Sequence, residues 1–330
     1  MAAAVKLFPD IELDITDPAV KEAKELVFYG LSGAPPTIAH GAILGLLAEL
    51  FPASIILLVP TSNLSGKASV TCTADYSYKG HDLRLAMQAA MIRSLKKPNI
   101  RISLHEQRIP GGLPTFQSIQ QLQTTYNKPI RVIWGEDSVD DIATRRWSNA
   151  KALANMIKDG KILVSYIPRS KETPTFKEKF MGPACDPKKW YDSADQDRTP
   201  FSEGEAETIV KNIINIAHVA GDRIKLLQVA EGVSSSKVRA ILQERAEGNL
   251  EELLIPEVIV ILEDYQPEDL WTPYSLPECE EPKKGGRSTK ITRKAYNKNN
   301  KRNKSNKSNK RNKHNKHNKS SKTRSRSSRR

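Results

Sequence analysis

Two side chains that can hydrogen-bond to phosphate lie three residues apart in the stretch GLSGAPPTIAH, residues 30–40. The stretch joins an apolar run to a sequence with helical spacing. A helix N-terminus presents unpaired N–H groups and partial positive charge, so it attracts anions. His40 in that first turn can donate to a phosphate oxygen, and Thr37 offers a hydroxyl to the same place. The stretch predicts a phosphate site, with a purely structural histidine as the alternative.

A second group of phosphate-binding residue types lies in EGVSSSKVR, residues 231–239. Serine hydroxyls and backbone amides at a helix start can hold the β- and γ-phosphates of a nucleotide. Arg239, in the first turn of the same predicted helix, adds a fixed fork of donors. The alternative is an ordinary helix cap followed by a solvated arginine.

A third stretch, GEDSVDDIATRRW, spans residues 135–147. Gly135 allows close approach of the backbone to a ligand. Asp137 can accept a hydrogen bond from a ribose hydroxyl or an adenine amine. Trp147 can stack on a ring, and the alternative for it is helix packing.

These groups need strands and helices to position them. Short apolar runs predict buried strands at 25–31, 54–60, 99–106, 130–134, 161–169 and 223–229. Helical spacing and terminal glycines predict helices at 41–50, 81–95, 115–126, 147–160, 203–221 and 234–248. This alternation predicts a doubly wound parallel α/β sheet. Ligands of such sheets bind at the carboxyl ends of the strands, where the strand order reverses. The loop after the first strand is therefore the expected site.

The motifs, in this order, resemble those of the nucleotidylyltransferases similar to nicotinate/nicotinamide mononucleotide adenylyltransferase. The first family motif is Gly-Gly-(Ser/Thr)-Phe-Asp-Pro-x-(His/Thr)-x-Gly-His. The chain matches it at Gly30, Ser32, Pro35, Thr37 and His40, and departs from it at Leu31, Gly33, Ala34 and Ala39. The second motif, Ile-Ser-(Ser/Thr)-(Ser/Thr)-x-(Ile/Val)-Arg, is matched by Val233, Ser234, Ser235, Ser236, Val238 and Arg239. The resemblance extends from about Glu25 to Asp264 and includes the Gly-x-Asp-(Ser/Asn) segment at Gly135.

This resemblance implies a Rossmann-like nucleotidylyltransferase that transfers the adenylyl group of ATP to a pyridine mononucleotide in NAD biosynthesis. The implied catalytic residues are His40, Thr37 and Arg239. The implied ATP-binding residues are Gly30, Ser32, His40, Ser235, Ser236 and Arg239. The implied mononucleotide-binding residues are Gly135, Asp137 and Trp147. Mg²⁺ is expected to accompany ATP, bound mostly by phosphate and water, without a metal site made by the protein.

Two alternatives stay open. One is a sister transferase that uses another acceptor, such as phosphopantetheine, because the Thr-x-x-His spacing is similar to that branch of the family. The other is a catalytically weakened nucleotide-binding or RNA-associated member, because Ala34 and Ala39 replace an aspartate and a glycine of the motif. The sequence does not separate the acidic from the amidated mononucleotide, and it leaves the oligomeric state open.

The C-terminal residues differ sharply from the rest of the chain. From Glu281 onward there are 21 Lys and Arg against one acidic residue, whereas the first 280 residues carry 31 basic and 37 acidic residues. Repeats of Asn, Lys and Ser bury too little surface to fold, so 283–330 is predicted to be a disordered basic tail. Nonspecific nucleic-acid binding, a nuclear address and a neutral expansion all suit it. The predicted organisation is an N-terminal extension at 1–24, a catalytic domain at 25–282 with a loop or insertion at 170–200, and the tail.

The three cysteines are Cys72, Cys185 and Cys279. Their odd number and wide spacing argue against a disulfide framework and a structural zinc site. No apolar run reaches the roughly 18 residues of a membrane span, and the first residues lack the pattern of a secretory signal. The sequence therefore predicts a cytoplasmic or nuclear protein that is neither secreted nor bound to a membrane.

Overall fold

The computed structural model describes residues 6–61, 77–78, 81–109, 113–169, 174–185, 197–221, 233–242 and 248–263. All of them lie in the unit Met1–Glu281. The predicted strand at 223–229, the predicted tail, Cys72 and Cys279 lie outside the described residues. Within the described residues, no helix is both long and apolar enough to cross a bilayer.

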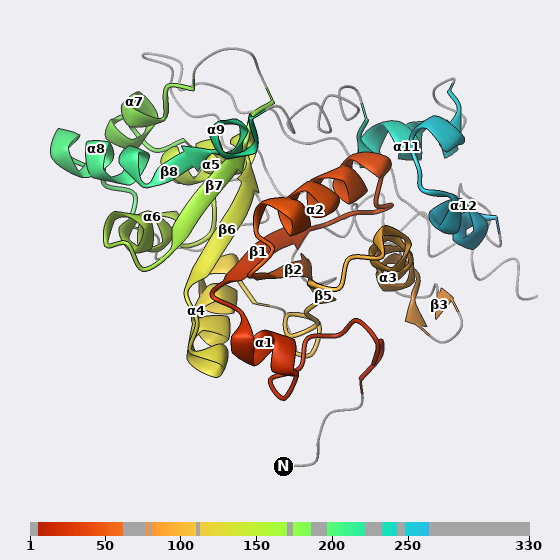
Figure 1. Ribbon diagram of the computed structural model, residues 1–330. Coiled ribbons are helices and arrows are strands. Elements are labelled where there is room, and N and C mark those ends of the chain that lie inside the picture. The colour runs from red at the N-terminus through yellow and green to blue at the C-terminus, as the bar shows by residue number, and fades with distance from the viewer. Residues whose placement is uncertain are drawn as a thin grey trace, which may run out of the picture. The chain divides into compact units, whose positions relative to one another are not determined.

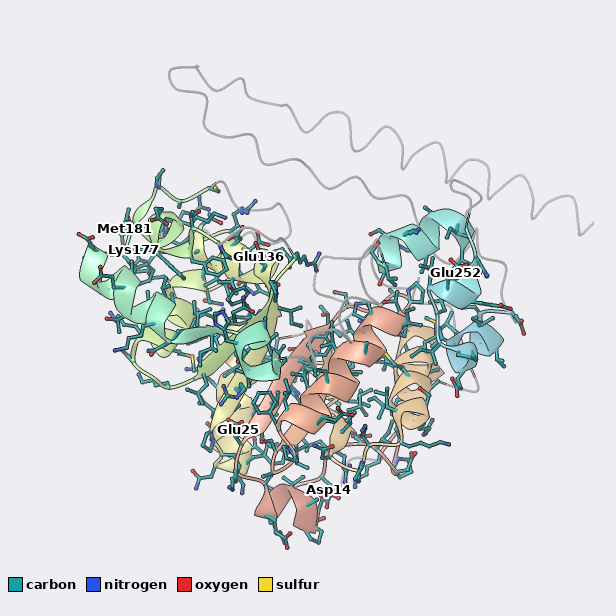
Figure 2. The ribbon with its side chains drawn as sticks, turned by 45° about the horizontal axis from the view of Figure 1, so that its top comes forward. Asp14, Glu25, Glu136, Lys177, Met181 and Glu252 are labelled. Carbon is teal, nitrogen blue, oxygen red and sulfur yellow. The ribbon has the colours of Figure 1, made fainter. Side chains whose placement is uncertain are left out.

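Six parallel strands form the central sheet (Figure 1). They are β1 (Leu26–Leu31), β2 (Ile55–Pro60), β5 (Ile100–Ile102), β6 (Ile130–Gly135), β7 (Leu163–Ile167) and β8 (Ile213–Asn215). Their order is β5-β2-β1-β6-β7-β8, which is the doubly wound order, reversing between β1 and β6. The predicted fold class is confirmed. Figure 2 labels Glu25 before β1 and Glu136 after β6, at opposite ends of the strands.

Helices cover both faces of the sheet (Figure 1). On one face, α2 (Ile38–Leu50) and α3 (Leu83–Leu95) pack on Val27 and Tyr29. On the other, α4 (Thr115–Tyr126), α5 (Glu136–Ala143) and α6 (Ala150–Lys158) pack on Leu26 and Phe28. Successive residues of β1 thus point to opposite buried faces. This burial on both sides explains why the strands are apolar at nearly every position.

The remaining elements lie around this core. A short antiparallel pair, β3 (Ser77–Tyr78) and β4 (His81–Asp82), precedes α3. A third apolar cluster joins α3 to α11 (Ser235–Leu242), the 3₁₀ turn η2 (Leu250–Glu252) and α12 (Pro256–Leu262). Within the stretch 170–200, predicted as a loop or insertion, α7 (Phe176–Met181) packs on the core through Phe176 and Phe180.

The single helix predicted at 203–221 is wrong in its middle. The structure has α8 (Glu203–Lys211), then strand β8, then α9 (Ile216–Ala220), which ends before Gly221 as predicted. Strand β8 pairs with β7 through Val164 and Ile213. The β-branched pair at 213–214 adopts the strand because the open edge of β7 offers backbone partners, and this pairing outweighs helical periodicity.

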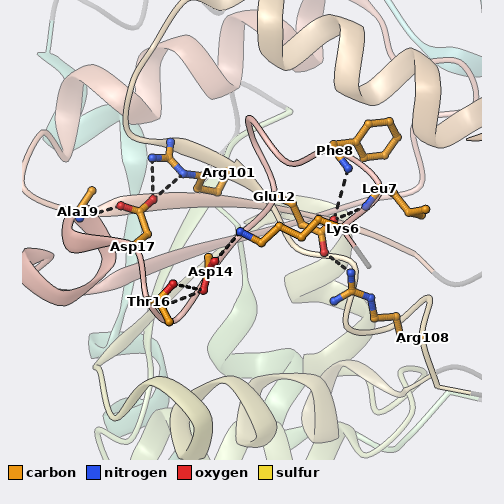
Figure 3. A network of polar contacts seen from close by, with 10 residues as sticks. All are labelled: Lys6, Leu7, Phe8, Glu12, Asp14, Thr16, Asp17, Ala19, Arg101 and Arg108. Carbon is orange, nitrogen blue, oxygen red and sulfur yellow. Dashed lines mark hydrogen bonds and ion pairs between the residues drawn. The ribbon is translucent and has the colours of Figure 1, made fainter. Parts of the chain in front are cut away.

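The N-terminal segment covers the opposite edge of the sheet (Figure 3). Ile102 of β5 donates its N–H to the Ile11 carbonyl at 2.9 Å and accepts from the Leu13 N–H at 2.8 Å. Between them, the buried Glu12 accepts from the Leu7 N–H at 2.9 Å and pairs with Arg108. An edge strand with unpaired backbone groups invites aggregation, and this segment, followed by α1 (Pro18–Glu22), caps that edge.

Candidate functional site

The three predicted motifs meet at the carboxyl edge of the sheet. The loop 32–37 follows β1, and Gly135 ends the neighbouring strand β6. The strand order reverses between these two strands, so their following loops diverge and leave space for a ligand. Helix α11 brings the second motif to the same loop, as its hydrogen bonds show.

Thr37 and His40 form one hydrogen-bonded unit at the start of α2. The Thr37 N–H donates to His40 Nδ1 at 2.9 Å, and the Thr37 hydroxyl lies 2.9 Å from the same nitrogen. Because Nδ1 accepts, the neutral imidazole carries its proton on Nε2. No described residue is a hydrogen-bond partner of Nε2. Thr37 is fully buried, so its side chain can influence a ligand only through His40.

The electrostatics of the site keep His40 uncharged. Burial, helped by the positive charge of Arg169, lowers the pKa of His40 from 6.5 to about 4. Desolvation disfavours the charged imidazolium, and a nearby cation disfavours it further. At neutral pH the His40 imidazole is therefore uncharged and has one N–H to donate. It can donate a hydrogen bond to a phosphate oxygen without adding a positive charge to that of Arg169.

The helix terminus itself offers fewer backbone donors than the sequence predicts. The Thr37 N–H is used by His40, and the Ile38 N–H donates to the Leu253 carbonyl at 3.0 Å. A helix start has only four such groups. An anion at this position would therefore depend more on side-chain donors than on the helix terminus.

Two fully buried polar residues of α3 hold the loop after β1. Arg84 Nη1 and Gln88 Nε2 donate to the Ser32 carbonyl at 3.2 and 3.1 Å. Gly33 has φ +44°, and a Cβ there would lie 2.9 Å from Gln88 Nε2. Glycine is therefore required at a position where the chain departs from the family motif. Arg84 and Gln88 were not among the predicted site residues. Two polar residues one turn apart in a largely apolar helix were the available signal for such a role.

The other predicted ATP-binding residues of this loop lie at its start. The Ser32 hydroxyl is 3.4 Å from Thr61 Oγ1, just beyond β2. Gly30 lies in β1, and a Cβ at that position would lie 3.2 Å from the ring of Phe28. The structure thus places Gly30 and Ser32 at the carboxyl edge.

The second motif is joined directly to the first. Ser235 Oγ donates to the Pro35 carbonyl at 2.8 Å, and Arg239 Nη1 donates to the Ala34 carbonyl at 2.6 Å. Arg239 Nη2 also donates to Ser236 Oγ at 2.9 Å. The second group of phosphate-binding residue types, on α11, therefore contacts the loop that leads to the first group, although the two are some 200 residues apart in the chain.

The third motif supplies a carboxylate with a cationic partner. Asp137 Oδ1 lies 3.3 Å from Arg169 Nε in the side chain. The backbone N–H of Arg169 donates to Glu136 Oε2 at 2.7 Å. A Cβ at Gly135 would lie 2.4 Å from Asp137 Oδ1, so a larger residue there would push the exposed Asp137 side chain aside. Arg169 was not among the predicted site residues. Its position at the end of the strand predicted at 161–169 was the available signal.

Trp147 lies in the turn between α5 and α6. It is half-buried and packs against the core on that face of the sheet. The fully buried Arg145 holds this turn by donating to the Ala143 and Phe180 carbonyls at 2.8 and 2.9 Å. This packing is consistent with the structural alternative for Trp147, and its stacking on a substrate ring stays a prediction.

Among the described residues, no cluster of three or more His, Cys, Asp or Glu side chains is placed to hold a metal ion. Cys185 is a free, half-buried cysteine.

No family model matches the chain. Over 141 residues, 42% of this chain and 75% of the other, it is 27% identical to a Helicobacter pylori protein named "Probable nicotinate-nucleotide adenylyltransferase". Two structures of Plasmodium falciparum nicotinic acid mononucleotide adenylyltransferase, complexed with NaAD and with APC, each give 17% identity and a TM-score of 0.47. Each alignment covers 75% of this chain and 98% of theirs. The motifs and the bacterial relative agree: the chain resembles the nicotinate/nicotinamide mononucleotide adenylyltransferases among the nucleotidylyltransferases.

Proposed function

We propose that this protein transfers the adenylyl group of ATP to a pyridine mononucleotide and releases pyrophosphate, as a step of NAD biosynthesis. The observation that supports it best is the direct bonding of Ser235 and Arg239 to the loop that carries His40. Nicotinate mononucleotide is the first acceptor to test, because the bacterial relative is named for it.

In the proposed reaction, a phosphate oxygen of the mononucleotide attacks the α-phosphorus of ATP. The bond from that phosphorus to the oxygen bridging to the β-phosphate breaks, and pyrophosphate leaves. A phosphate group is largely ionised at neutral pH, so the nucleophile needs no general base. The work of the protein is positioning and charge stabilisation.

His40 donates its Nε2 proton in a hydrogen bond to the phosphate oxygens as negative charge develops. Thr37 keeps the ring in the tautomer that has this proton outward. Ser235, Ser236 and Arg239 hold the departing pyrophosphate. ATP enters as its Mg²⁺ complex, in which the ion neutralises phosphate charge and keeps mostly water and phosphate oxygens as ligands.

The acceptor occupies the other side of the loop in this proposal. Gly135 allows the nucleotide close to the backbone, and Asp137 accepts from a ribose hydroxyl. Trp147 stacks on the pyridine ring after a rearrangement of its side chain or of the turn that carries it.

The test is product analysis with purified protein, Mg²⁺ and ATP, and separate acceptors: nicotinate mononucleotide, nicotinamide mononucleotide and phosphopantetheine. A dinucleotide with a pyridine base, formed with one pyrophosphate per turnover, is expected. Product from phosphopantetheine alone would assign the protein to the sister branch. ATP binding without product from any acceptor would identify a nucleotide-binding protein.

We infer a separate role for the basic tail, because its charge of +20 is confined to residues 281–330. The tail contains one aromatic residue, Tyr296, so base stacking adds little and binding to polyanions is nonspecific and salt-dependent. A protein truncated before Pro282 is expected to keep its turnover and to lose RNA and DNA binding at moderate salt. Loss of turnover, or unchanged nucleic-acid binding, would refute this division of roles. A nuclear address, tested by the location of a tail fusion, and a neutral expansion are the competing explanations.

A further inference from the structure

Arg169 lies at the carboxyl edge of the sheet, and the reaction described above gives it no role. Ile167, the last residue of β7, pairs with Gly135 of β6. Two residues further on, the Arg169 N–H donates to Glu136 Oε2 at 2.7 Å, which fixes its backbone at the start of α5. A Cβ at Gly135 would lie 3.5 Å from Arg169 Nε and Nη2. The guanidinium therefore lies over Gly135.

The charge of Arg169 reaches the centre of the site. It contributes to the lowered pKa of His40, and it acts on Tyr29, whose pKa burial raises. Tyr29 is in β1, next to the loop that leads to His40. A cation felt by both residues lies within electrostatic reach of a phosphate bound at His40.

The present partner of Arg169 is easily displaced. The Arg169 and Asp137 side chains are 70% and 58% exposed, and Arg169 Nε lies 3.3 Å from Asp137 Oδ1. Exposed ion pairs of this kind contribute little to stability. A guanidinium binds a phosphate through two parallel hydrogen bonds, which is a stronger arrangement. An incoming phosphate can therefore replace Asp137 at small cost.

Arg169 and Arg239 approach the site from different sides. Arg239 is on α11, whose Val238 packs with Leu83 of α3, next to β2 and β5. Arg169 follows β7, on the far side of β6. Figure 2 shows this separation through Glu136, at the start of α5, and Glu252, near α11, on opposite sides of the helix that carries His40.

In an in-line displacement, the attacking and the leaving oxygens lie on opposite sides of the phosphorus. The proposed function assigns the leaving pyrophosphate to Arg239. The attacking phosphate then lies on the side of Arg169. The geometry points to Arg169 as the residue that binds the phosphate of the mononucleotide acceptor, exchanging Asp137 for that phosphate. This inference rests on the proposed function for the direction of attack.

The experiment measures the affinity of each substrate separately from turnover. Nicotinate mononucleotide is titrated calorimetrically in the presence of an ATP analogue with a methylene α,β-bridge, and ATP is titrated alone. Arg169→Ala is expected to weaken the mononucleotide roughly 10- to 100-fold, the range for one lost charge-assisted contact. ATP affinity is expected to change less than about threefold, because Arg239 and His40 remain. Arg169→Lys, which keeps the charge without the fork, is expected to recover part of the loss.

Lys161→Ala is the matched control. Lys161 lies just before the amino end of the same strand, its side chain is 64% exposed, and it also pairs with an aspartate, Asp159. Its replacement is expected to leave both affinities unchanged.

Three outcomes decide the matter. If Arg169→Ala weakens ATP as much as the mononucleotide, or changes neither, the assignment is overturned. If the wild-type protein binds the mononucleotide through Arg169 but forms no dinucleotide, the proposed function fails and this assignment stands. A wild-type protein that binds no mononucleotide overturns both.

Discussion

Replacement of His40 by asparagine separates its contact with Thr37 from the role that the proposed function gives it. His40 Nδ1 accepts from the Thr37 N–H at 2.9 Å, which stabilises the start of α2, and in the proposed function Nε2 donates to the ligand. In the variant, the carboxamide oxygen can take the place of Nδ1 as acceptor. Nothing then replaces Nε2. His40→Asn is therefore expected to keep the helix cap and lose the contact with phosphate.

The magnitudes follow from these two contacts. Losing a helix cap costs about 1 kcal/mol. The free energy of unfolding of His40→Asn should therefore lie within about 1 kcal/mol of the wild-type value, and that of His40→Ala should be about 1 kcal/mol lower still. Removing one preorganised donor to transition-state charge costs roughly 100- to 1000-fold in turnover. Both variants should therefore lose at least about 100-fold in kcat.

The assay pairs kcat, from dinucleotide formation at saturating substrates, with the free energy of unfolding in urea for all three proteins. Near-full turnover of His40→Asn would show that Nε2 is not used in the reaction. A variant that fails to fold would instead favour a structural histidine, the alternative that the sequence left open.

Further predictions concern the other site residues and the pH range of stability. Arg239→Ala should weaken ATP far more than the mononucleotide, with Lys237→Ala on the same helix as control; equal losses would refute its assignment to the leaving pyrophosphate. Trp147→Ala should raise KM for the mononucleotide, whereas an unchanged KM with a lower Tm would make Trp147 a core residue only. His105, which bridges Ser103 Oγ at 2.9 Å and Ser118 Oγ at 2.5 Å, has its pKa lowered by burial to about 4. In the unfolded chain, His105 takes up a proton near pH 6.5. The contribution of the buried, neutral His105 to stability is therefore complete above that pH and is lost as the pH falls toward 4. Across this window, the free energy of unfolding of the wild-type protein should fall more steeply than that of His105→Gln, by about 1 kcal/mol per pH unit, and parallel pH profiles would contradict the assignment.

Local sequence patterns determined most of the architecture. The apolar runs at 25–31 and 130–134 predict β1 and β6, because a strand buried on both faces must be apolar at nearly every position. The period of residues 115–126 predicts α4 with its observed ends. Ser234 caps α11 by accepting the Lys237 N–H at 3.1 Å, as its place before a helical sequence indicates. The phosphate motifs are also local, so their residue types could be recognised without the fold.

Only the tertiary structure decided how these pieces meet. β8 is a strand because β7 has an open edge beside it, a condition that its own sequence does not contain. The bonds of Arg239 and Ser235 to Ala34 and Pro35 require the docking of α11 on a loop some 200 residues earlier.

The protonation of His40 is likewise a tertiary property. It depends on the burial of the ring and on a cation that arrives from the end of β7. Short-range periodicity and capping are encoded in neighbouring residues, whereas pairing, desolvation and charge proximity arise between residues distant in the chain. For this reason Thr37 and His40 could be found in the sequence, but the effect of Arg169 on His40 and the tautomer of His40 could be found only in the folded protein.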